Sequence, residues 1–242
     1  MPTSSIPSPI LIVVPTYNEA ENIGSLIPAI LESTKGFDVR VLVVDDDSTD
    51  GTARLVTEIA AAETRVKLLS RRGKLGLGTA YVAGFRYAME NGFALVVSMD
   101  ADFSHSPSHL PALIEASAGA GVVVGSRYIK GGGVSNWPVH RKILSRVANA
   151  LAHALLRVHA RDCTSGYRAY RREILEQVDF NDIHSDGYSF LIELLTLCER
   201  RGVAVRETPI HFVDRRGGVS KISKIEIFKA LATLWRLFWK RG

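Results

Sequence analysis

The sequence predicts an α/β protein in which a mostly parallel central sheet is flanked by helices. Short runs of β-branched and apolar residues recur along the first half, and a helical pattern separates each run from the next. Continuous apolar runs are typical of strands buried on both faces, as in a parallel sheet. Strand–helix–strand units of this kind form parallel pairs, so one sheet with helices on its faces is expected.

The first unit shows how the elements are placed. Residues 10–14 are the first predicted strand, which Pro15 ends. Asn18 is the expected N-cap of the next helix, with Glu21 three residues later as its capping-box partner. Pro28 lies inside the apolar helical pattern and predicts a kink or an early stop.

The same cycle continues along the chain. Further strands are predicted at residues 39–44, 66–69, 94–99 and 121–125, with helices at 52–62, 79–91 and 107–117. The second half is less regular, with helices at 141–158, 188–200 and 222–239 and a late strand at 203–213. The last helix mixes aromatic and basic residues, which indicates an amphipathic element. No internal repeat or long linker is seen, so residues 1–242 are expected to form a single domain.

Composition narrows the class of protein. The 242 residues are 46% hydrophobic with a net charge of +5, which fits a globular domain that binds a phosphate-rich ligand or an anionic membrane surface. Nucleic acid is disfavoured because basic and aromatic residues are not interleaved along one stripe. Cys163 and Cys198 have neither metal-ligand nor disulfide spacing, which indicates a reducing cytosolic compartment. The sequence shows no signal peptide and no apolar run of about 18 residues, so a soluble or surface-attached protein is expected.

Three polar clusters follow predicted strands, where open α/β sheets bind their ligands. They are residues 15–19, Asp45-Asp46-Asp47 and Asp100-Ala101-Asp102. Buried strands need no carboxylates at their tips, although aspartate is also a common turn residue. Three clusters at one sheet edge favour a ligand site over turn chemistry alone.

Asp100 and Asp102 are the candidate metal ligands. Two carboxylates two residues apart repel each other unless a positive charge lies between them. Mg²⁺ or Mn²⁺ suits such hard oxygen ligands and would neutralise the charge that develops on a departing diphosphate. The alternative is that these residues cap the helix beginning near Pro107.

The segment Gly73-Lys74-Leu75-Gly76-Leu77-Gly78 is rich in glycine but is neither a Walker A loop nor a dinucleotide fingerprint. A loop that brings Lys74 to a diphosphate and a plain solvent loop both fit this pattern.

Further motifs make a resemblance specific. The residue runs 13–19, 43–48, 100–102 and 125–128 resemble inverting nucleotide-sugar transferases of the GT-A (Rossmann-like) fold. Residues 162–170, Asn136-Trp137-Pro138 and residues 218–221 are similar to polyprenol (dolichol) phosphate mannosyltransferases. The likeness extends from about Ile10 to Ser223. It divides the single domain into a nucleotide-sugar half (10–126), an acceptor half (127–221) and a C-terminal amphipathic helix (222–242).

The resemblance implies roles for particular residues. Positions that hold the guanosine part of GDP-mannose match Pro15, Tyr17, Glu19, Val44 and Asp46. Asp100, Ala101 and Asp102 match the diphosphate and metal turn, to which Lys74 is added as a loop lysine. Arg127, Arg141 and Arg215 match phosphate-binding arginines, with Lys221 nearby. The expected catalytic residues are Asp102, Arg127, Arg141 and Arg215.

Two positions depart from the family pattern. Ser104 stands where the family can have a glutamine metal ligand, so Ser104, water or His105 is expected to complete the coordination of Asp100 and Asp102. Ile222 replaces a methionine of the usual Ser-Lys-Met-Ser run, which is a mild apolar change. Neither departure removes a charge that the mechanism needs.

The implied reaction is transfer of mannose from GDP-mannose to a polyprenyl or dolichyl phosphate with inversion, assisted by Mg²⁺ or Mn²⁺. The implied location is the cytosolic face of a membrane, either directly or through a separate membrane-anchoring protein. The last helix suits this location through aromatic and basic residues, which are Phe228, Leu231, Trp235, Phe238, Trp239, Lys224, Lys229, Arg236, Lys240 and Arg241. Packing of that helix on the sheet or on another subunit is the alternative. UDP-glucose or a UDP-N-acetylhexosamine as donor, and a non-catalytic nucleotide-binding membrane scaffold, are the other functions considered.

Overall fold

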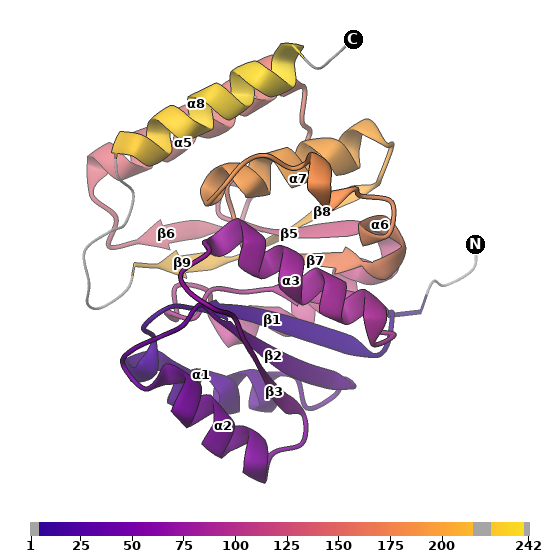
Figure 1. The fold of residues 1–242 in the computed structure, drawn as a ribbon. Helices are drawn as coiled ribbons and strands as arrows, with labels where there is room; N and C mark the ends of the chain where they lie inside the picture. Colours follow the sequence, from indigo (N-terminus) through magenta and orange to yellow (C-terminus); the bar gives the residue numbers. More distant parts are fainter. Residues whose placement is uncertain (1–4, 215–223, 240–242) are drawn as a thin grey trace.

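A computed structural model describes residues 5–214 and 224–239 of the chain (Figure 1). Its main sheet has seven strands in the order β3-β2-β1-β4-β7-β5-β8. The strands are β1 (Ile10–Thr16), β2 (Val39–Asp45), β3 (Val66–Ser70), β4 (Leu95–Ser98), β5 (Val122–Ser126), β7 (Arg168–Arg171) and β8 (Val205–Pro209). Only β7 is antiparallel to its neighbours in this sheet, so the predicted mostly parallel α/β fold is confirmed.

Helices cover both faces of the sheet. One face packs on α1 (Ala20–Ser33), α2 (Thr52–Ala62) and α4 (Leu110–Ala116). The other packs on α3 (Leu77–Glu90), α5 (Val139–Leu156), α6 (Arg172–Leu175), α7 (Tyr188–Arg200) and α8 (Lys224–Trp239). Short 3-10 turns lie at Pro107–His109, Ser117–Gly119 and Phe180–Asp182. Alternate residues of β1 point into the two cores, which is why its apolar run is continuous.

Local signals misplaced the start and the path of α1. Asn18 adopts a left-handed conformation (φ 56°) and makes no capping box with Glu21. Instead, the backbone N–H groups of Glu19 and Ala20 donate to Thr52 and Asp50, at 2.9 Å each. The helix begins at Ala20 and continues through Pro28 to Ser33, so the predicted early stop is wrong. Side chains from the β2–α2 loop and from the first residue of α2 therefore replace the predicted local cap.

The second half departs further from the prediction. The predicted late strand is two strands, β8 in the main sheet and β9 (His211–Val213), which pairs with β6 (Gly133–Ser135) in a separate small sheet. The strand β7 was not predicted at all. It inserts between β4 and β5, and its entry brings residues 162–167 to the edge where the parallel strands end.

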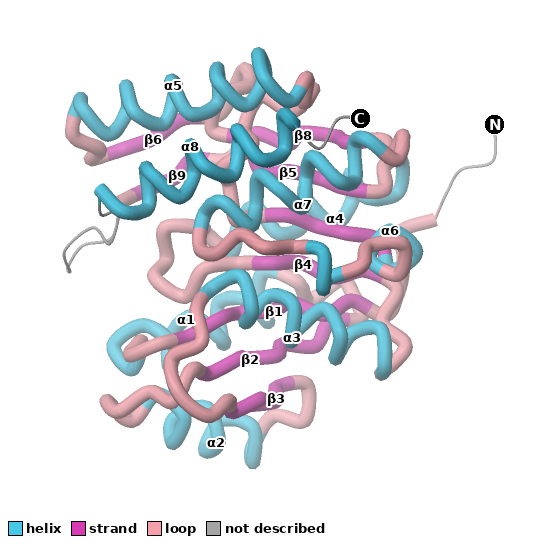
Figure 2. Tube along the Cα trace, turned by 45° about the horizontal axis from the view of Figure 1, so that its top comes forward, coloured by secondary structure: helices cyan, strands magenta, loops and turns pink. Residues whose placement is uncertain are grey.

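The C-terminal helix α8 lies alongside α5 and also contacts α7 (Figure 2). Leu234 and Leu237 are buried against this helical layer, whereas Trp235 and Trp239 are 61% and 68% exposed. The helix thus packs on the protein through its buried leucines and also exposes aromatic side chains to solvent. In the part of the chain that the structure describes, no helix has both the length and the apolar character to cross a bilayer.

Candidate active site

The candidate site lies at the carboxyl edge of the sheet, where β1, β2 and β4 end next to one another. β1 pairs with β2 on one side and with β4 on the other, which makes this the point where the strand order reverses. Such switch points form the ligand crevice of open α/β sheets. The loop before β7 joins them, because Ser98 Oγ donates to the carbonyl oxygen of Gly166 at 2.7 Å.

The turn after β4 presents the two predicted metal ligands. Asp100 accepts a hydrogen bond from the Tyr81 hydroxyl at 3.0 Å, and its side chain is 27% exposed. Asp102 Oδ1 accepts the backbone N–H of Ser104 at 3.1 Å, which closes the turn. The 3-10 turn that follows is capped by Ser106, so the helix-cap alternative for these aspartates is wrong.

His105 supports this turn from behind. Its Nδ1 accepts the backbone N–H of Asp100 at 3.1 Å, and its ring stacks on Tyr167 with centroids 4.9 Å apart. Burial lowers the pKa of His105, in spite of the opposing charge of Asp100 and Asp102, so the imidazole is neutral. A neutral ring whose Nδ1 already accepts a hydrogen bond has no lone pair left on that nitrogen for a metal.

The residues of the turn fit a hard divalent cation. The Oγ of Ser104 is buried and has no hydrogen-bond partner, and such an orphaned oxygen would gain a partner from a cation. Among the described residues, no group of three or more His, Cys, Asp or Glu side chains could hold a metal by itself. Asp100 and Asp102 would therefore share a cation with oxygens of another molecule, as Mg²⁺ does when it binds a nucleotide.

Asp46 organises the glycine-rich loop. Arg71 Nε donates to its Oδ1 at 2.6 Å, and the backbone N–H groups of Leu75 and Gly76 donate to its Oδ2 at 3.0 and 2.9 Å. Both carboxylate oxygens thus bind the protein itself, and Asp46 is only 4% exposed. Asp46 thus fixes the loop to the end of β2, and whether Lys74 reaches a diphosphate stays a prediction.

The other predicted nucleotide residues divide into two groups. Lys74 lies over the ring of Tyr17, with its Nζ 4.1 Å from the centroid, so these two residues are brought together. Glu19 and Pro15 are partly exposed at the same edge. By contrast, the side chains of Val44 and Ala101 are buried in the two cores and can shape the site only from beneath.

Asp45 is explained by turn chemistry. Its carboxylate accepts the hydroxyls of Thr16 and Ser48 at 2.8 and 2.6 Å, as well as the backbone N–H of Ser48 at 3.0 Å. These bonds tie the end of β1 to the turn after β2.

Arg127 is held in a buried ion pair at the end of β5. Its Nε and Nη2 each donate to the carboxylate of Asp162 at 2.7 Å, and Nη2 also donates to Thr164 at 2.7 Å. Arg127 is 8% exposed and Asp162 is fully buried. Burial raises the pKa of Asp162, but the charge and hydrogen bonds of Arg127 outweigh it and hold the pKa below its usual value. This geometry gives Arg127 a framework role, and its contact with phosphate stays a prediction.

Arg141 lies near Arg127 at the start of α5. Its guanidinium is 4.3 Å from the ring centroid of Trp137, against which Arg127 also lies at 5.2 Å. Nη1 donates to Asp214 at 2.8 Å, whereas its buried Nε has no hydrogen-bond partner. The two predicted arginines therefore meet around one indole. Arg215 and Lys221 lie outside the described residues.

The sequence prediction missed three residues of this site. Tyr81 was assigned to a helix, Asp162 was quoted only within a motif, and Trp137 was given no role. Asp162 and Trp137 carried a signal, because both lie in motifs of the family resemblance, residues 162–170 and Asn136-Trp137-Pro138. Tyr81 carried none and became apparent only when α3 was placed against the site.

Residues 11–179 match the family model "Glycosyl transferase family 2". The match covers most of the chain, including β1, β2, β4 and the Asp100–Asp102 turn. The chain belongs to glycosyl transferase family 2.

Two curated relatives extend the match over nearly the whole chain. Polyprenol monophosphomannose synthase of Mycolicibacterium smegmatis is 45% identical over 223 residues, covering 91% of this chain and 83% of that protein. Undecaprenyl-phosphate mannosyltransferase of Micrococcus luteus is 41% identical over 231 residues, covering 94% and 93% respectively. The predicted resemblance to polyprenol phosphate mannosyltransferases is confirmed.

Solved structures support the fold. Glucosyl-3-phosphoglycerate synthase from Mycobacterium tuberculosis, in complex with Mn²⁺, UDP and glucosyl-3-phosphoglycerate, superposes with a TM-score of 0.68 at 23% identity, over 95% of this chain and 80% of that one. The same enzyme with Mg²⁺ and UDP gives a TM-score of 0.67 at 22% identity, over 95% and 79%. The GT-A-like architecture is thereby confirmed.

Proposed function

We propose that this glycosyltransferase moves mannose from GDP-mannose to a polyprenyl phosphate, with inversion at the anomeric carbon. The observation that carries the proposal is the Asp100–Asp102 turn at the switch point of the sheet, beside the ordered Asp46 loop. The names of both curated relatives support mannose and a polyprenyl phosphate as the group transferred and its acceptor. The guanosine part of the donor rests on the matched positions Tyr17, Glu19 and Asp46.

Asp100, Asp102 and the orphaned Ser104 hydroxyl would hold Mg²⁺ or Mn²⁺. Structures of the same fold that contain Mn²⁺ or Mg²⁺ with UDP support this choice. When bound, the cation supplies Lewis-acid stabilisation of the leaving diphosphate. The carboxylates of Asp100 and Asp102 supply the negative charge that attracts such a cation to the turn.

The acceptor needs little activation, because a phosphate monoester is anionic at neutral pH. One of its oxygens forms a bond to the anomeric carbon, while the bond from that carbon to the diphosphate oxygen breaks and its electron pair leaves with GDP. The protein must align these anionic groups, a task suited to the planar guanidinium fork. The contacts of the Arg141 guanidinium with Trp137 and Asp214 support this role for Arg141. Arg215, which follows Asp214 in the sequence, is proposed to help it.

A transfer assay tests the proposal against its alternatives. Labelled GDP-mannose, UDP-glucose and UDP-N-acetylglucosamine are each offered with a short polyprenyl phosphate, with and without Mn²⁺. We expect metal-dependent product from GDP-mannose only. Product from a UDP-sugar would replace the donor assignment, and binding of nucleotide without turnover from any donor would support the scaffold.

Ser104→Ala tests the predicted third ligand. Because alanine removes only a hydroxyl that makes no hydrogen bond to the protein, the fold should be unaffected. We expect the Kd for Mn²⁺ to rise a few-fold, measured by the electron paramagnetic resonance signal of free Mn²⁺. An unchanged Kd would show that Ser104 is not a ligand, and that water and the donor phosphates complete the coordination of the cation.

The location on a membrane is also proposed. α5 exposes Val139, Ile143 and Val147, one turn apart, at 71%, 57% and 48%. The neighbouring α8 exposes Trp235 and Trp239. Exposed apolar and aromatic residues beside basic ones such as Arg146 suit the interface of an anionic bilayer. Arg236 does not contribute as predicted, since its Nη2 donates to Glu193 and Ser185, at 2.7 Å each.

We expect the double variant Ile143→Ser, Trp239→Ser to bind anionic vesicles about tenfold more weakly, because it removes apolar area from both helices. Co-sedimentation with vesicles containing phosphatidylglycerol measures this, with phosphatidylcholine vesicles as the reference. Transfer to a short, water-soluble acceptor should be unaffected, which separates docking from catalysis. Equal sedimentation of the variant and the unchanged protein would reject the membrane surface.

A further inference from the structure

We propose that Tyr81 is a positioning residue, which holds the carboxylate of Asp100 in the orientation needed to bind the cation. The inference rests on the metal turn of the proposed function. The Tyr81 hydroxyl donates to Asp100 Oδ1 at 3.0 Å, and the side chain is fully buried. Tyr81 belongs to α3, nineteen residues before Asp100, so this contact joins two separate parts of the site.

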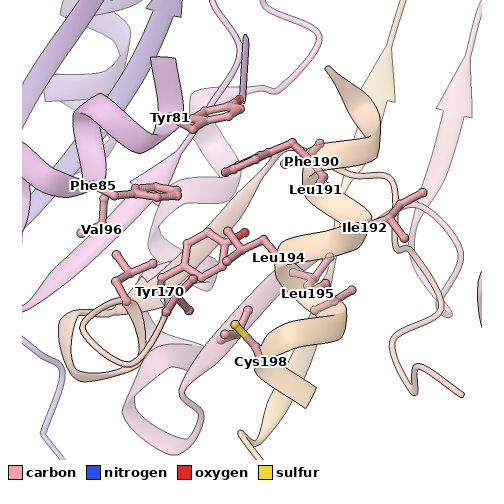
Figure 3. Close-up of a cluster of buried hydrophobic side chains, with 14 of the residues drawn as sticks. Tyr81, Phe85, Val96, Tyr170, Phe190, Leu191, Ile192, Leu194, Leu195 and Cys198 are labelled. Carbon is pink, nitrogen blue, oxygen red and sulfur yellow. The ribbon is translucent and has the colours of Figure 1, made fainter. Parts of the chain in front are cut away.

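Two aromatic rings pack against the ring of Tyr81. It stacks on Phe85 and on Phe190, with ring centroids 6.1 and 6.3 Å apart. Figure 3 shows these three rings next to one another. α3 also lies directly on the sheet, because a Cβ at Gly84 would collide with Val13 of β1. With its ring and its helix both packed, the hydroxyl has one position, which is what a positioning donor needs.

The chemistry of the donor suits a cation ligand. A neutral phenol orients a carboxylate through one hydrogen bond without cancelling its negative charge, whereas lysine or arginine would compete with the metal. Gly166 lies beside this pair, where even an added Cβ would make only ordinary van der Waals contacts. A Cβ there would lie 3.4 Å from the Tyr81 hydroxyl oxygen and 3.5 Å from Asp100 Oδ1.

The same helix is anchored on the nucleotide side. Asp46 accepts the backbone N–H of Gly76, which immediately precedes α3, and the carbonyl oxygen of Gly76 accepts the N–H of Ala80. Tyr81 follows Ala80 directly. The first turn of α3 thus connects the loop at the end of β2 with the metal turn at the end of β4.

The variant Tyr81→Phe tests this role, because it keeps the ring in its cluster and removes only the hydroxyl. We expect the Kd for Mn²⁺ to rise five- to tenfold, measured by the resonance signal of free Mn²⁺ with saturating GDP present and corrected for the Mn²⁺ that GDP binds alone. Transfer should fall at low Mn²⁺ and recover at saturating Mn²⁺. The midpoint of thermal unfolding should fall by no more than about 4 °C, since one hydrogen bond is lost.

Tyr170→Phe is the matched control. Tyr170 is equally buried and packs edge-on against Phe85, but its hydroxyl accepts from Arg168 at 3.3 Å rather than contacting the metal turn. Its loss should affect stability and leave the Kd for Mn²⁺ unchanged. If Tyr81→Phe also bound Mn²⁺ normally, Tyr81 would be an ordinary core residue and the metal site would stand. If the unchanged protein bound no Mn²⁺ even with GDP present, the metal site and this inference would both be wrong.

Discussion

We expect Asp102→Asn to lose at least about 100-fold in the rate of mannosyl transfer, equivalent to about 3 kcal/mol of transition-state stabilisation. Asparagine keeps a side-chain oxygen that can accept the N–H of Ser104, so the turn itself should survive. What it loses is the negative charge that a divalent cation needs. The measurement is transfer from GDP-mannose to a short polyprenyl phosphate over a range of Mn²⁺ concentrations.

The comparison with other variants makes this result specific. Asp102→Ala removes both the charge and the oxygen that closes the turn, and should be no more active than Asp102→Asn. Asp38→Asn serves as the control, because this exposed carboxylate immediately precedes β2, at the opposite edge of the sheet. Near-normal turnover of Asp102→Asn, with its dependence on Mn²⁺ retained, would remove Asp102 from the metal site.

The first half of the fold was predictable because its signals are local. α2 has the predicted bounds, and β1, β2 and β3 extend theirs by one or two residues, because an apolar run between polar turns marks a buried parallel strand. The capping of α1 was not predictable in this way. Its donors are satisfied by Thr52 and Asp50, which are about thirty residues away in sequence.

The strand β7 shows why the second half was harder. Arg168 lies in the middle of the main sheet and is fully buried, where an apolar residue is expected. Its guanidinium donates to the carbonyl oxygens of Leu191 and Cys163, at 2.6 Å each. These hydrogen bonds offset the free-energy cost of burying the charge. Periodicity cannot reveal a strand that buries an arginine whose hydrogen-bond partners lie outside the strand.

The site was predicted in its residue types more than in their roles. Asp100 and Asp102 lie together as expected, and Lys74 meets Tyr17. The side chains of Asp46 and Arg127, however, form several hydrogen bonds with other groups of the protein. A sequence shows that a charged residue follows a strand, but not whether its partner is a ligand or a buried side chain.

The Arg127–Asp162 pair leads to the second large effect. We expect Asp162→Asn to lower the free energy of unfolding by about 3–5 kcal/mol, because it leaves a buried guanidinium without its counter-charge. For a domain of this size the unfolding midpoint should fall by on the order of 10 °C. Glu58→Gln, which breaks the exposed Arg54–Glu58 pair, should cost less than about 0.5 kcal/mol. Denaturation by urea measures both.

The same pair predicts a pH dependence. Because the pKa of Asp162 is lower in the folded than in the unfolded protein, its contribution is fully present above the unfolded value of about 4. The contribution is lost as the pH falls through the lowered folded pKa. Unfolding free energies measured from pH 6 down to pH 3 should therefore decline less steeply in Asp162→Asn than in the unchanged protein.

The double variant Arg127→Met, Asp162→Asn separates structure from catalysis. Removing both charges should recover most of the stability lost in Asp162→Asn, since no buried charge is left unpaired. The side-chain oxygen of asparagine can still accept the backbone N–H at position 127, so that hydrogen bond is kept. If Arg127 also binds a phosphate, the double variant will be stable but slow in transfer. If both the unfolding free energy and the transfer rate recover in the double variant, Arg127 has only a structural role. The acceptor phosphate would then be bound by Arg141 and its neighbours.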